Sequence, residues 1–422
     1  MNLLFYLHQF PAIGGIETVT ATLANAFAAQ GHQVTLVSHR YTADDCVSTR
    51  LNPGIDVLHM PGTENVSSRN TAFLQQTIRE KKIDVVIFQD SYVRIEENLF
   101  VQGLTVPVVV CEHNAPFKVK VREPRPFSVR EFLGRVKFFL QKESLYRSEG
   151  TRRRWLYARC SRYVLLSNRF FGEFRAVTRL ADTRKLRAIP NPLAPCFVSP
   201  RQLPNFVPSA PSPTDNESES LAHLRRRGRR RDEVLQLPRS FETKKLNEIV
   251  FAATLDRRKG CDLLLLAWER IGPHFPNWRL TILGDGTERT RLETFAREHG
   301  LSNVSFEGYQ SNPVPYFQRA KIFAFPSRFE GWGLVLVEAM AQGCVPVAFD
   351  SYASVRDIIQ DGVNGRIVPA FDIVAYAKAF EELMTNEARW TSAQQAALVT
   401  PNRFDVRSVV SEWTKLLAQV GK

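Results

Sequence analysis

Residues Phe325 to Phe349 read FPSRFEGWGLVLVEAMAQGCVPVAF and contain the clearest strand–loop–helix signal in the chain. This stretch begins with the last residue of an apolar run that stops at Pro326, which is typical of a buried strand followed by a loop. Gly331 and Gly333 allow the backbone of this loop to approach a ligand closely. An apolar helix and a second buried strand are predicted to follow. The first turn of such a helix leaves backbone N–H groups unpaired, so the stretch predicts an anion site.

Two glutamates stand on either side of this predicted helix start. Glu330 lies in the loop, and Glu338 lies about 7 Å along the helix axis, at ~1.5 Å per residue. One carboxylate at the mouth of the site and a second behind it suit a ligand that is rich in hydroxyl groups and also carries phosphate. The pattern alone also allows an alternative to a ligand site, which is a strand–loop–helix unit with a purely structural role.

The stretch resembles the E-x7-E signature of the retaining glycosyltransferases of family 4. The resemblance implies an α/β protein with the GT-B fold, in which two Rossmann-like doubly wound domains face each other across a cleft. It implies that Glu330 contacts the donor sugar and that Glu338 holds the ribose hydroxyls of the nucleotide. The donor-binding residues that it implies around the first glutamate are Glu330, Gly331, Trp332, Gly333 and Leu334.

The organisation of the chain agrees with two such domains. Alternating strand and helix signals predict a Rossmann-like domain over residues 1–195, which would bind the acceptor, and another over residues 246–400, which would bind the nucleotide sugar. The last segment, 401–422, is predicted to be a helix that could pack back on the first domain. Residues 199–245 are rich in proline, polar residues and arginine, and they predict a disordered insert or linker.

Further segments resemble motifs of this family, and they follow one another along the chain in the same order as in the family. Gly14 and Gly15 follow the first predicted strand and are similar to the family's glycine loop, which would approach the donor. Residues 254–260, 284–286 and 361–365 resemble landmarks of its donor domain. An ordinary tight turn after a strand is the alternative for the two glycines.

Cations precede the donor loop in sequence. Arg258 and Lys259 stand next to each other, and two cations placed at a leaving diphosphate would stabilise the charge that develops there. By resemblance, Lys259 matches the diphosphate lysine of the family. The family's paired arginine usually stands five residues earlier, where this chain has Thr254. Arg258 or Arg257 could replace that arginine, and a solvated charged turn is the alternative.

His113 follows a buried strand, so it is expected at the carboxyl edge of the first sheet, where ligands of α/β proteins bind. The family often has a histidine at this strand end, which implies that His113 contacts the donor sugar. Ser167 and Asn168 after the next strand are weaker candidates, and Asn191 between two prolines is interpreted as structural. The predicted catalytic residues are therefore Glu330, His113 and Lys259.

The sequence shows no second carboxylate pair that would act as nucleophile and acid. This agrees with the family, for which a front-face reaction is the usual proposal: the departing phosphate helps to deprotonate the acceptor hydroxyl. A metal-binding D-x-D signature is lacking, because Asp350 is solitary. The resemblance implies no cofactor and no bound metal, with a nucleotide diphosphate sugar as co-substrate.

The charge of the chain is +13, and most of it comes from one segment. From Lys118 to Arg162 there are 14 Lys/Arg and 4 Asp/Glu residues, with apolar residues among them. An amphipathic basic helix of this kind could lie on an anionic membrane, and a core helix with a solvated face is the alternative. The cluster at 225–231 has six arginines in seven residues, but no aromatic residues interleave with it, so nucleic acid is not the expected partner.

Other features concern the compartment. No run approaches ~18 apolar residues, the N-terminus has no basic leader, and the cysteines are scattered without a C-x-x-C pair. These features favour a reduced, cytoplasmic protein, which could lie on the inner face of the membrane.

The sequence therefore predicts a retaining glycosyltransferase. It would move a sugar from a nucleotide diphosphate sugar to a glycan or lipid-linked acceptor in surface polysaccharide or lipopolysaccharide biosynthesis. The alternatives are a non-catalytic nucleotide-sugar-binding scaffold and a nucleotide-sugar epimerase on the same fold.

Overall fold

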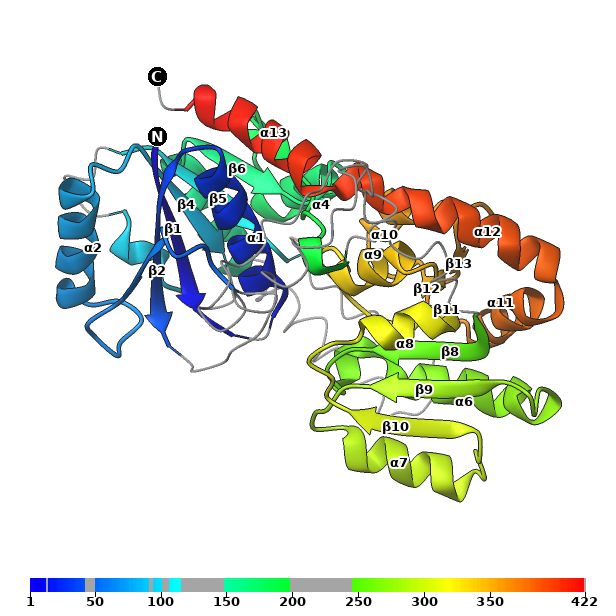
Figure 1. Cartoon of the computed structure of the whole chain (residues 1–422). Coiled ribbons are helices and arrows are strands. Elements are labelled where there is room, and N and C mark those ends of the chain that lie inside the picture. The colour runs from blue at the N-terminus through cyan, green and yellow to red at the C-terminus, as the bar shows by residue number, and fades with distance from the viewer. Residues whose placement is uncertain are drawn as a thin grey trace, which may run out of the picture.

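The computed structural model describes residues 1–12, 14–41, 50–90, 94–100, 106–114, 148–197 and 245–420 (Figure 1). The predicted insert lies outside the described residues except for Lys245, and so does the part of the basic segment before residue 148.

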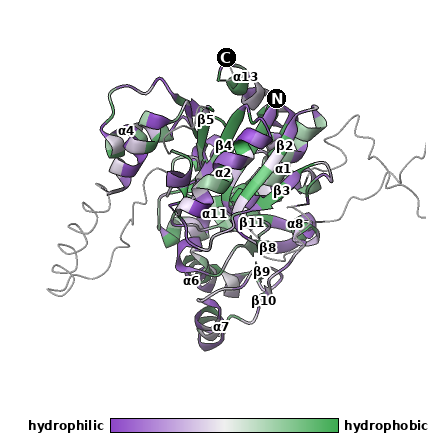
Figure 2. Ribbon diagram, turned by 90° about the vertical axis from the view of Figure 1, so that its left-hand side faces the viewer, coloured by the Kyte–Doolittle hydropathy of each residue, from purple (hydrophilic) through white to green (hydrophobic). Residues whose placement is uncertain are grey.

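The first domain is built on a seven-stranded parallel sheet with the strand order β3-β2-β1-β4-β5-β6-β7. The strands are β1 (Asn2–Gln9), β2 (Gln33–Arg40), β3 (Asp56–His59), β4 (Val85–Asp90), β5 (Val108–Glu112), β6 (Arg162–Leu165) and β7 (Leu186–Ala188). The helices are α1 (Gly15–Ala29), α2 (Ser68–Glu80), α4 (Phe170–Thr178) and the helical residues 148–159. The central strands are continuous apolar runs because helices cover both faces of the sheet. In Figure 2 the strands β4 and β5 are green, whereas α2 carries purple residues.

The second domain has a six-stranded parallel sheet with the order β10-β9-β8-β11-β12-β13. The strands are β8 (Leu246–Ala252), β9 (Arg279–Leu283), β10 (Val304–Gly308), β11 (Ala320–Phe325), β12 (Val345–Phe349) and β13 (Arg366–Val368). The helices are α6 (Cys261–Ile271), α7 (Arg289–Glu298), α8 (Val314–Arg319), α9 (Leu334–Ala341), α10 (Val355–Ile358), α11 (Ile373–Thr385) and α12 (Glu387–Val399). Both predicted doubly wound domains are therefore confirmed.

Each sheet has a switch point where the strand order reverses. The first strand of each domain lies inside its sheet, so that β1 pairs with β2 and β4, and β8 pairs with β9 and β11. Ligands of open α/β sheets bind outside the carboxyl ends of the strands at such points. The segments that follow β1, β8 and β11 are therefore well placed for a site, and these segments carry most of the predicted residues.

The last helix, α13 (Val406–Ala418), returns to the first domain and packs against α1 (Figure 1). Asp405 caps its start by accepting hydrogen bonds from the backbone of Arg407 and Ser408. The buried face of the helix includes Trp413, which belongs to the same apolar cluster as Phe5 and other residues of the first sheet. The chain thus crosses between the domains a second time after residue 399.

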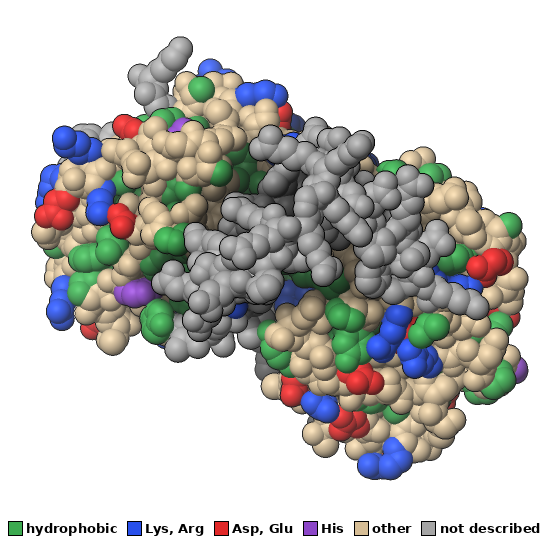
Figure 3. Space-filling view, in the orientation of Figure 1, with side chains coloured by type: hydrophobic (Ala, Val, Ile, Leu, Met, Phe, Trp, Pro, Cys, Tyr) green, Lys and Arg blue, Asp and Glu red, His purple; other side chains and the backbone are tan. Residues whose placement is uncertain are grey.

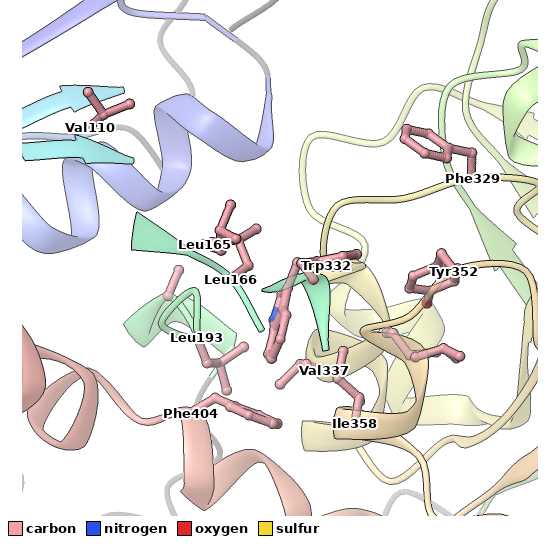
Figure 4. Packing of buried hydrophobic residues seen from close by; sticks show 14 of the residues in the cluster. Val110, Leu165, Leu166, Leu193, Phe329, Trp332, Val337, Tyr352, Ile358 and Phe404 are labelled. Carbon is pink, nitrogen blue, oxygen red and sulfur yellow. The ribbon is translucent and has the colours of Figure 1, made fainter. Parts of the chain in front are cut away.

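An apolar core also joins the two domains. Trp332 from the second domain meets the ring of Phe404 edge to face, with the centroids 5.2 Å apart. Leu165, Leu166 and Leu193 of the first domain lie beside the two rings (Figure 4). Polar contacts add to this core: the backbone N–H of Leu193 donates to the carbonyl of Phe404, Gln342 donates to the carbonyl of Phe197, and Arg169 pairs with Asp357. One mixed cluster therefore fixes the arrangement of the domains.

The described end of the basic segment is less exposed than its charge suggests. Arg152 and Arg153 are buried, and they pair with Glu96 and Glu112, respectively. These two guanidinium groups stabilise the first domain and are not available to a nucleic acid or a membrane, whereas Arg154 is exposed. On the face shown in Figure 3, side chains of both charge signs are scattered over both domains. Within the described ranges, no helix is long and apolar enough to cross a membrane.

Candidate functional site

A cleft of about 520 Å³ lies between the two domains, at the carboxyl ends of both sheets. Every residue predicted for the donor site lines this cleft. The lining residues of the first domain are Gly14, Gly15, Ile16, Thr18, His113, Asn114, Asn191 and Phe197. Those of the second domain are Ala252, Ala253, Thr254, Arg258, Lys259, Tyr309, Gln310, Ser311, Pro313, Glu330, Gly331, Trp332, Gly333, Leu334, Val335 and Glu338.

The glycine before α9 has a backbone that other residues rarely adopt. Gly333 is the N-cap residue, with φ of 91°. A β-carbon there would lie 3.1 Å from the hydroxyl oxygen of Tyr352 and 3.2 Å from Cζ of Phe325. Gly333 therefore lets the chain turn into α9 over two buried rings, and the unpaired N–H groups of the first turn of α9 are presented at the cleft.

Glu330 is held by donors from two loops. Its Oε1 accepts a hydrogen bond from Nζ of Lys259 at 2.6 Å and another from Oγ of Ser327 at 3.0 Å. Its Oε2 lies 3.9 Å from Nη1 of Arg258. The side chain is 9% exposed, so these partners fix the position of a nearly buried carboxylate. The loop after β8 and the loop after β11 therefore meet at a carboxylate–ammonium pair.

The cations belong to a short turn, η5 (Arg257–Lys259), which follows β8. Asp256 caps this turn by accepting from the backbone N–H of Lys259 at 3.1 Å. Both Arg258 and Lys259 line the cleft, whereas Arg257 does not contribute to the lining. Of the two arginines that could replace the family arginine absent at Thr254, the structure thus brings Arg258 to the site.

Glu338, on α9, also lines the cleft, and its carboxyl group has a raised pKa. Burial raises the pKa of its carboxyl group to about 8. Among the described residues it has no hydrogen-bond or ion-pair partner. The carboxyl group is therefore mostly protonated at neutral pH, and a ligand that donates hydrogen bonds would favour its ionised form.

His113 is buried at the end of β5 and is neutral. Burial lowers the pKa of its imidazole to about 4. Its Nε2 lies within hydrogen-bond distance of Oε1 of Gln89, so Nε2 carries the proton and donates to Gln89. Nδ1 is then an acceptor, and it has no partner in the part of the chain that the structure describes. Gln89 lies on a different strand, β4, and was not predicted as a partner of His113.

The two domains touch at two glycines that the sequence assigned to ligand approach. A β-carbon on Gly331 would lie 1.9 Å from the carbonyl oxygen of His113, and one on Gly15 would lie 3.3 Å from Cδ1 of Leu334. Gly331 therefore allows one wall of the cleft to contact the other. Trp332 borders the cleft, but its ring is directed toward Phe404 in the interdomain core (Figure 4).

Several lining residues were not predicted. Tyr309, Gln310 and Ser311 follow the carboxyl end of β10, and this position in the sheet was the signal that could have found them. Asn191 was interpreted as structural, but it also lines the cleft, whereas Ser167 and Asn168 do not. Within the described ranges, no group of three or more His, Cys, Asp or Glu side chains is arranged to hold a metal ion.

Comparison with known families agrees with this geometry. Residues 13–195 match the family described as Glycosyltransferase Family 4, and residues 236–398 match Glycosyl transferases group 1. The chain belongs to the family 4 glycosyltransferases. The two matches divide this glycosyltransferase into the same domains that the two sheets define.

Curated relatives match parts of this glycosyltransferase. An exopolysaccharide phosphotransferase of Streptomyces coelicolor is 33% identical over 185 residues, which are 43% of this chain and 19% of the relative. The lipopolysaccharide core biosynthesis glycosyltransferase LpsE of Rhizobium meliloti is 31% identical over 163 residues, or 38% and 46%. A Campylobacter jejuni N-acetylgalactosaminyltransferase named for a PP-undecaprenol-linked glycan is 29% identical over 182 residues, or 43% and 50%. The matches thus span half or less of the length of these relatives.

Solved structures share the fold over nearly the whole chain. A crystal structure of HepE from Anabaena in complex with UDP and glucose superimposes with a TM-score of 0.67. The alignment covers 99% of this chain and 100% of HepE, at 16% sequence identity. The GT-B fold of this glycosyltransferase is therefore confirmed.

Proposed function

We propose that this protein transfers a sugar from a nucleotide diphosphate sugar to a glycan or lipid-linked acceptor, with retention of configuration. The observation that supports this most strongly is the pairing of Lys259 with Glu330 beside the start of α9. This arrangement offers a cation, a carboxylate and unpaired backbone N–H groups within one cleft. A sugar attached to a diphosphate presents the complementary groups, which are phosphate oxygens and hydroxyls.

The diphosphate would lie between the turn η5 and the N-terminus of α9. Lys259 and Arg258 supply two positive charges, and the first turn of α9 supplies N–H donors. Charge grows on the phosphate as the bond to the sugar breaks, so cations already in place stabilise the transition state more than the bound donor. Arg258 would then have the role of the arginine that family members have at the position of Thr254.

Hydroxyl groups of the donor would be held by the remaining polar side chains. Glu330 would accept hydrogen bonds from the sugar, and Glu338 would accept from the ribose once it is ionised. Nδ1 of His113 is an acceptor without a described partner, which suits a sugar hydroxyl. Because burial lowers the pKa of the His113 imidazole to about 4, this ring is a weak proton acceptor and is less suited to act as the catalytic base.

The reaction would proceed on one face of the sugar. The bond between the anomeric carbon and the phosphate oxygen breaks, the acceptor oxygen bonds to the same carbon, and the acceptor proton passes to the departing phosphate. Glu330 and Glu338 are the acidic residues among the described lining residues. Glu330 is held by Lys259 and Ser327, and Glu338 would be occupied by the ribose hydroxyls, so neither group suits a covalent intermediate.

The acceptor is inferred from the relatives. Their names refer to exopolysaccharide, lipopolysaccharide core and a PP-undecaprenol-linked glycan. We therefore place the enzyme in the biosynthesis of a surface polysaccharide or lipopolysaccharide, in the cytoplasm or on the inner face of the membrane. A nucleotide-sugar epimerase would need carboxylates on the side of the first domain. The described lining residues of that domain include none.

A thermal-shift panel tests the proposal. UDP, GDP, ADP and their sugar conjugates are added to the wild type and to Glu338→Ala. A nucleotide at ~100 times its dissociation constant stabilises the folded state by ~2.7 kcal/mol. We expect one nucleotide to raise the melting temperature of the wild type much more than that of the variant. If no nucleotide stabilises the wild type, the transferase proposal is refuted.

A further inference from the structure

We infer that Arg328 is a positioning residue that fixes the turn η5, and with it Arg258 and Lys259, relative to Glu330. Arg328 lies two residues before Glu330 in the loop after β11. Its role in catalysis rests on the proposed function, whereas its structural contacts do not.

Arg328 makes two hydrogen bonds to the turn η5 and two to helix α6. Its backbone N–H donates to the carbonyl of Arg258 at 2.8 Å, and its Nη1 donates to the carbonyl of Arg257 at 2.7 Å. The guanidinium also makes a two-pronged pair with Asp262 of α6, at 2.7 and 2.9 Å. The loop of Glu330 therefore binds both the backbone of η5 and the helix that follows it.

Close packing against the loop of Glu330 defines the position of the turn η5. Gly260, which ends η5, has φ of 72°, and a β-carbon there would lie 2.0 Å from the carbonyl oxygen of Pro326. The backbone of the turn thus packs directly on the loop of Glu330. This packing sets how close the two loops come, and Arg328 prevents them from sliding past each other.

Arg328 acts on the turn and not on the ligand. Its side chain is 12% exposed, and it is not among the residues that line the cleft. Lys259 has a flexible four-carbon stem, so the direction of its ammonium group depends on where the backbone of η5 is held. A displacement of about 1 Å at a reacting group can cost about 10²-fold in rate. Small movements of this turn are therefore expected to lower the transfer rate.

A lysine cannot reproduce these contacts. A guanidinium has a planar fork of donors that can reach a carboxylate and a carbonyl together, whereas an ammonium is a point donor. Burial by itself raises the pKa of Asp262, but the hydrogen bonds and charge of Arg328 and nearby arginines outweigh it, so the pKa lies below its usual value. The pair is thus ionised at neutral pH.

The test compares Arg328→Lys with Arg356→Lys. Arg356 makes a similar two-pronged pair with Asp350 in the same domain, at 3.0 and 2.6 Å, but it does not line the cleft. Binding of UDP is measured by calorimetry, or binding of GDP or ADP if the panel selects that nucleotide. Circular dichroism checks folding. Each arginine variant is also combined with Lys259→Ala.

We expect Arg328→Lys to weaken nucleotide binding by about 10-fold or more, and Arg356→Lys to leave it within about 2-fold. In the Lys259→Ala background, Arg328→Lys should have a much smaller effect, because residues that act through each other are not additive. If Arg328 had only a structural role, Arg328→Lys would lower the melting temperature, but its effect on binding would add to that of Lys259→Ala. Unchanged binding in Arg328→Lys, or an equal effect in both backgrounds, would overturn the inference.

A variant that does not fold and a wild type that does not bind nucleotide would each be informative. If Arg328→Lys does not fold, Asp262→Asn removes one side of the fork and keeps Arg328, and the same loss of binding and of additivity is expected. Failure of the wild type to bind any nucleotide in the panel would refute the proposed function, and this inference with it. Normal binding by the wild type and by both folded variants would refute the inference alone.

Discussion

Nζ of Lys259 lies 2.6 Å from Oε1 of Glu330, although the two residues come from loops after different strands. The side chains are 15% and 9% exposed, so solvent screens this ion pair only weakly. A bound diphosphate would provide a second negative partner for the ammonium group. In the proposed function, the pair would therefore link binding of the diphosphate to the position of the Glu330 carboxylate.

This link makes Lys259→Ala the most informative single substitution. It removes a charge at the leaving phosphate and leaves Glu330 with Ser327 as its close donor, so we expect the transfer rate to fall at least ~10²-fold. Lys415→Ala is the control, since Lys415 also makes a 2.6 Å ion pair, with Glu412 on α13, but is 65% exposed. Steady-state kinetics with the identified donor measures both. A rate within about 3-fold of the wild type would remove Lys259 from the mechanism.

The acidity of Glu338 predicts a pH-dependent stability. Because its folded-state pKa is raised to about 8, from a usual value of 4.5, the folded protein favours the protonated form. The contribution of Glu338 to the free energy of unfolding is therefore favourable at low pH, and it is lost as the pH rises from about 4.5 to about 8. Glu338→Gln does not titrate, so the variant should gain stability relative to the wild type across this window, by at most ~1.4 kcal/mol per pH unit.

Urea unfolding at pH 5, 6.5 and 8 measures this difference. Glu412→Gln, a change at a carboxylate that is 56% exposed, is the control and should show little dependence. Nucleotide affinity should change in the opposite sense, because a ribose hydroxyl binds the ionised carboxylate: the wild type should bind more tightly as pH rises toward 8. A difference between Glu338→Gln and the wild type that is constant with pH would contradict the assigned pKa.

The fold and the donor loop could be predicted from the sequence because their signals are local. The apolar runs of β1, β5 and β11 and the glycines that follow β1 and β11 define strand–loop–helix units, and parallel topology then brings the loops to one edge. The spacing of Glu330 and Glu338 lies within one such unit. The resemblance added the roles of these residues, which spacing alone does not give.

Contacts between distant segments could not be predicted in this way. Arg152 and Arg153 look like exposed charges, because their partners Glu96 and Glu112 stand 56 and 41 positions away. The same holds for Gln89 beside His113 and for Arg328 beside η5. Trp332 stands in the signature and lines the cleft, but the packing of its ring against Phe404 could not be predicted, because only the tertiary structure brings the two rings together.

Gly331→Ala tests whether the two walls of the cleft must touch. The new β-carbon would lie 1.9 Å from the carbonyl oxygen of His113 and 3.0 Å from Cα of Asn114, and backbone atoms cannot move aside as a side chain can. We expect the domains to separate at this point and transfer to fall at least ~10-fold, because the first-domain residues would lose their position at the donor. Nucleotide binding, which depends mainly on the second domain, should change by less than about 3-fold.

The matched control for this change is Gly172→Ala. A β-carbon at Gly172, on α4, would meet no atom within 4 Å, so the variant should be fully active. Steady-state kinetics and calorimetry with the same nucleotide measure both variants. Normal transfer by Gly331→Ala would show that the contact seen between the walls is not required during the reaction.

The hydrogen bond between His113 and Gln89 predicts a fixed tautomer. Nε2 donates to Gln89 and the imidazole pKa is lowered to about 4, so His113 should stay neutral, with the proton on Nε2, from pH 8 down to about pH 5. Nitrogen NMR of histidine-labelled protein reports the tautomer directly, and His113→Asn identifies the signal. Gln89→Leu should mix the two tautomers while leaving the ring neutral, because burial is the cause of the lowered pKa. Donor binding should then shift the Nδ1 signal of the wild type, since Nδ1 gains a hydroxyl donor. A midpoint near 6.5 for His113 would instead show a solvated imidazole, and the histidine would then be a candidate for proton transfer.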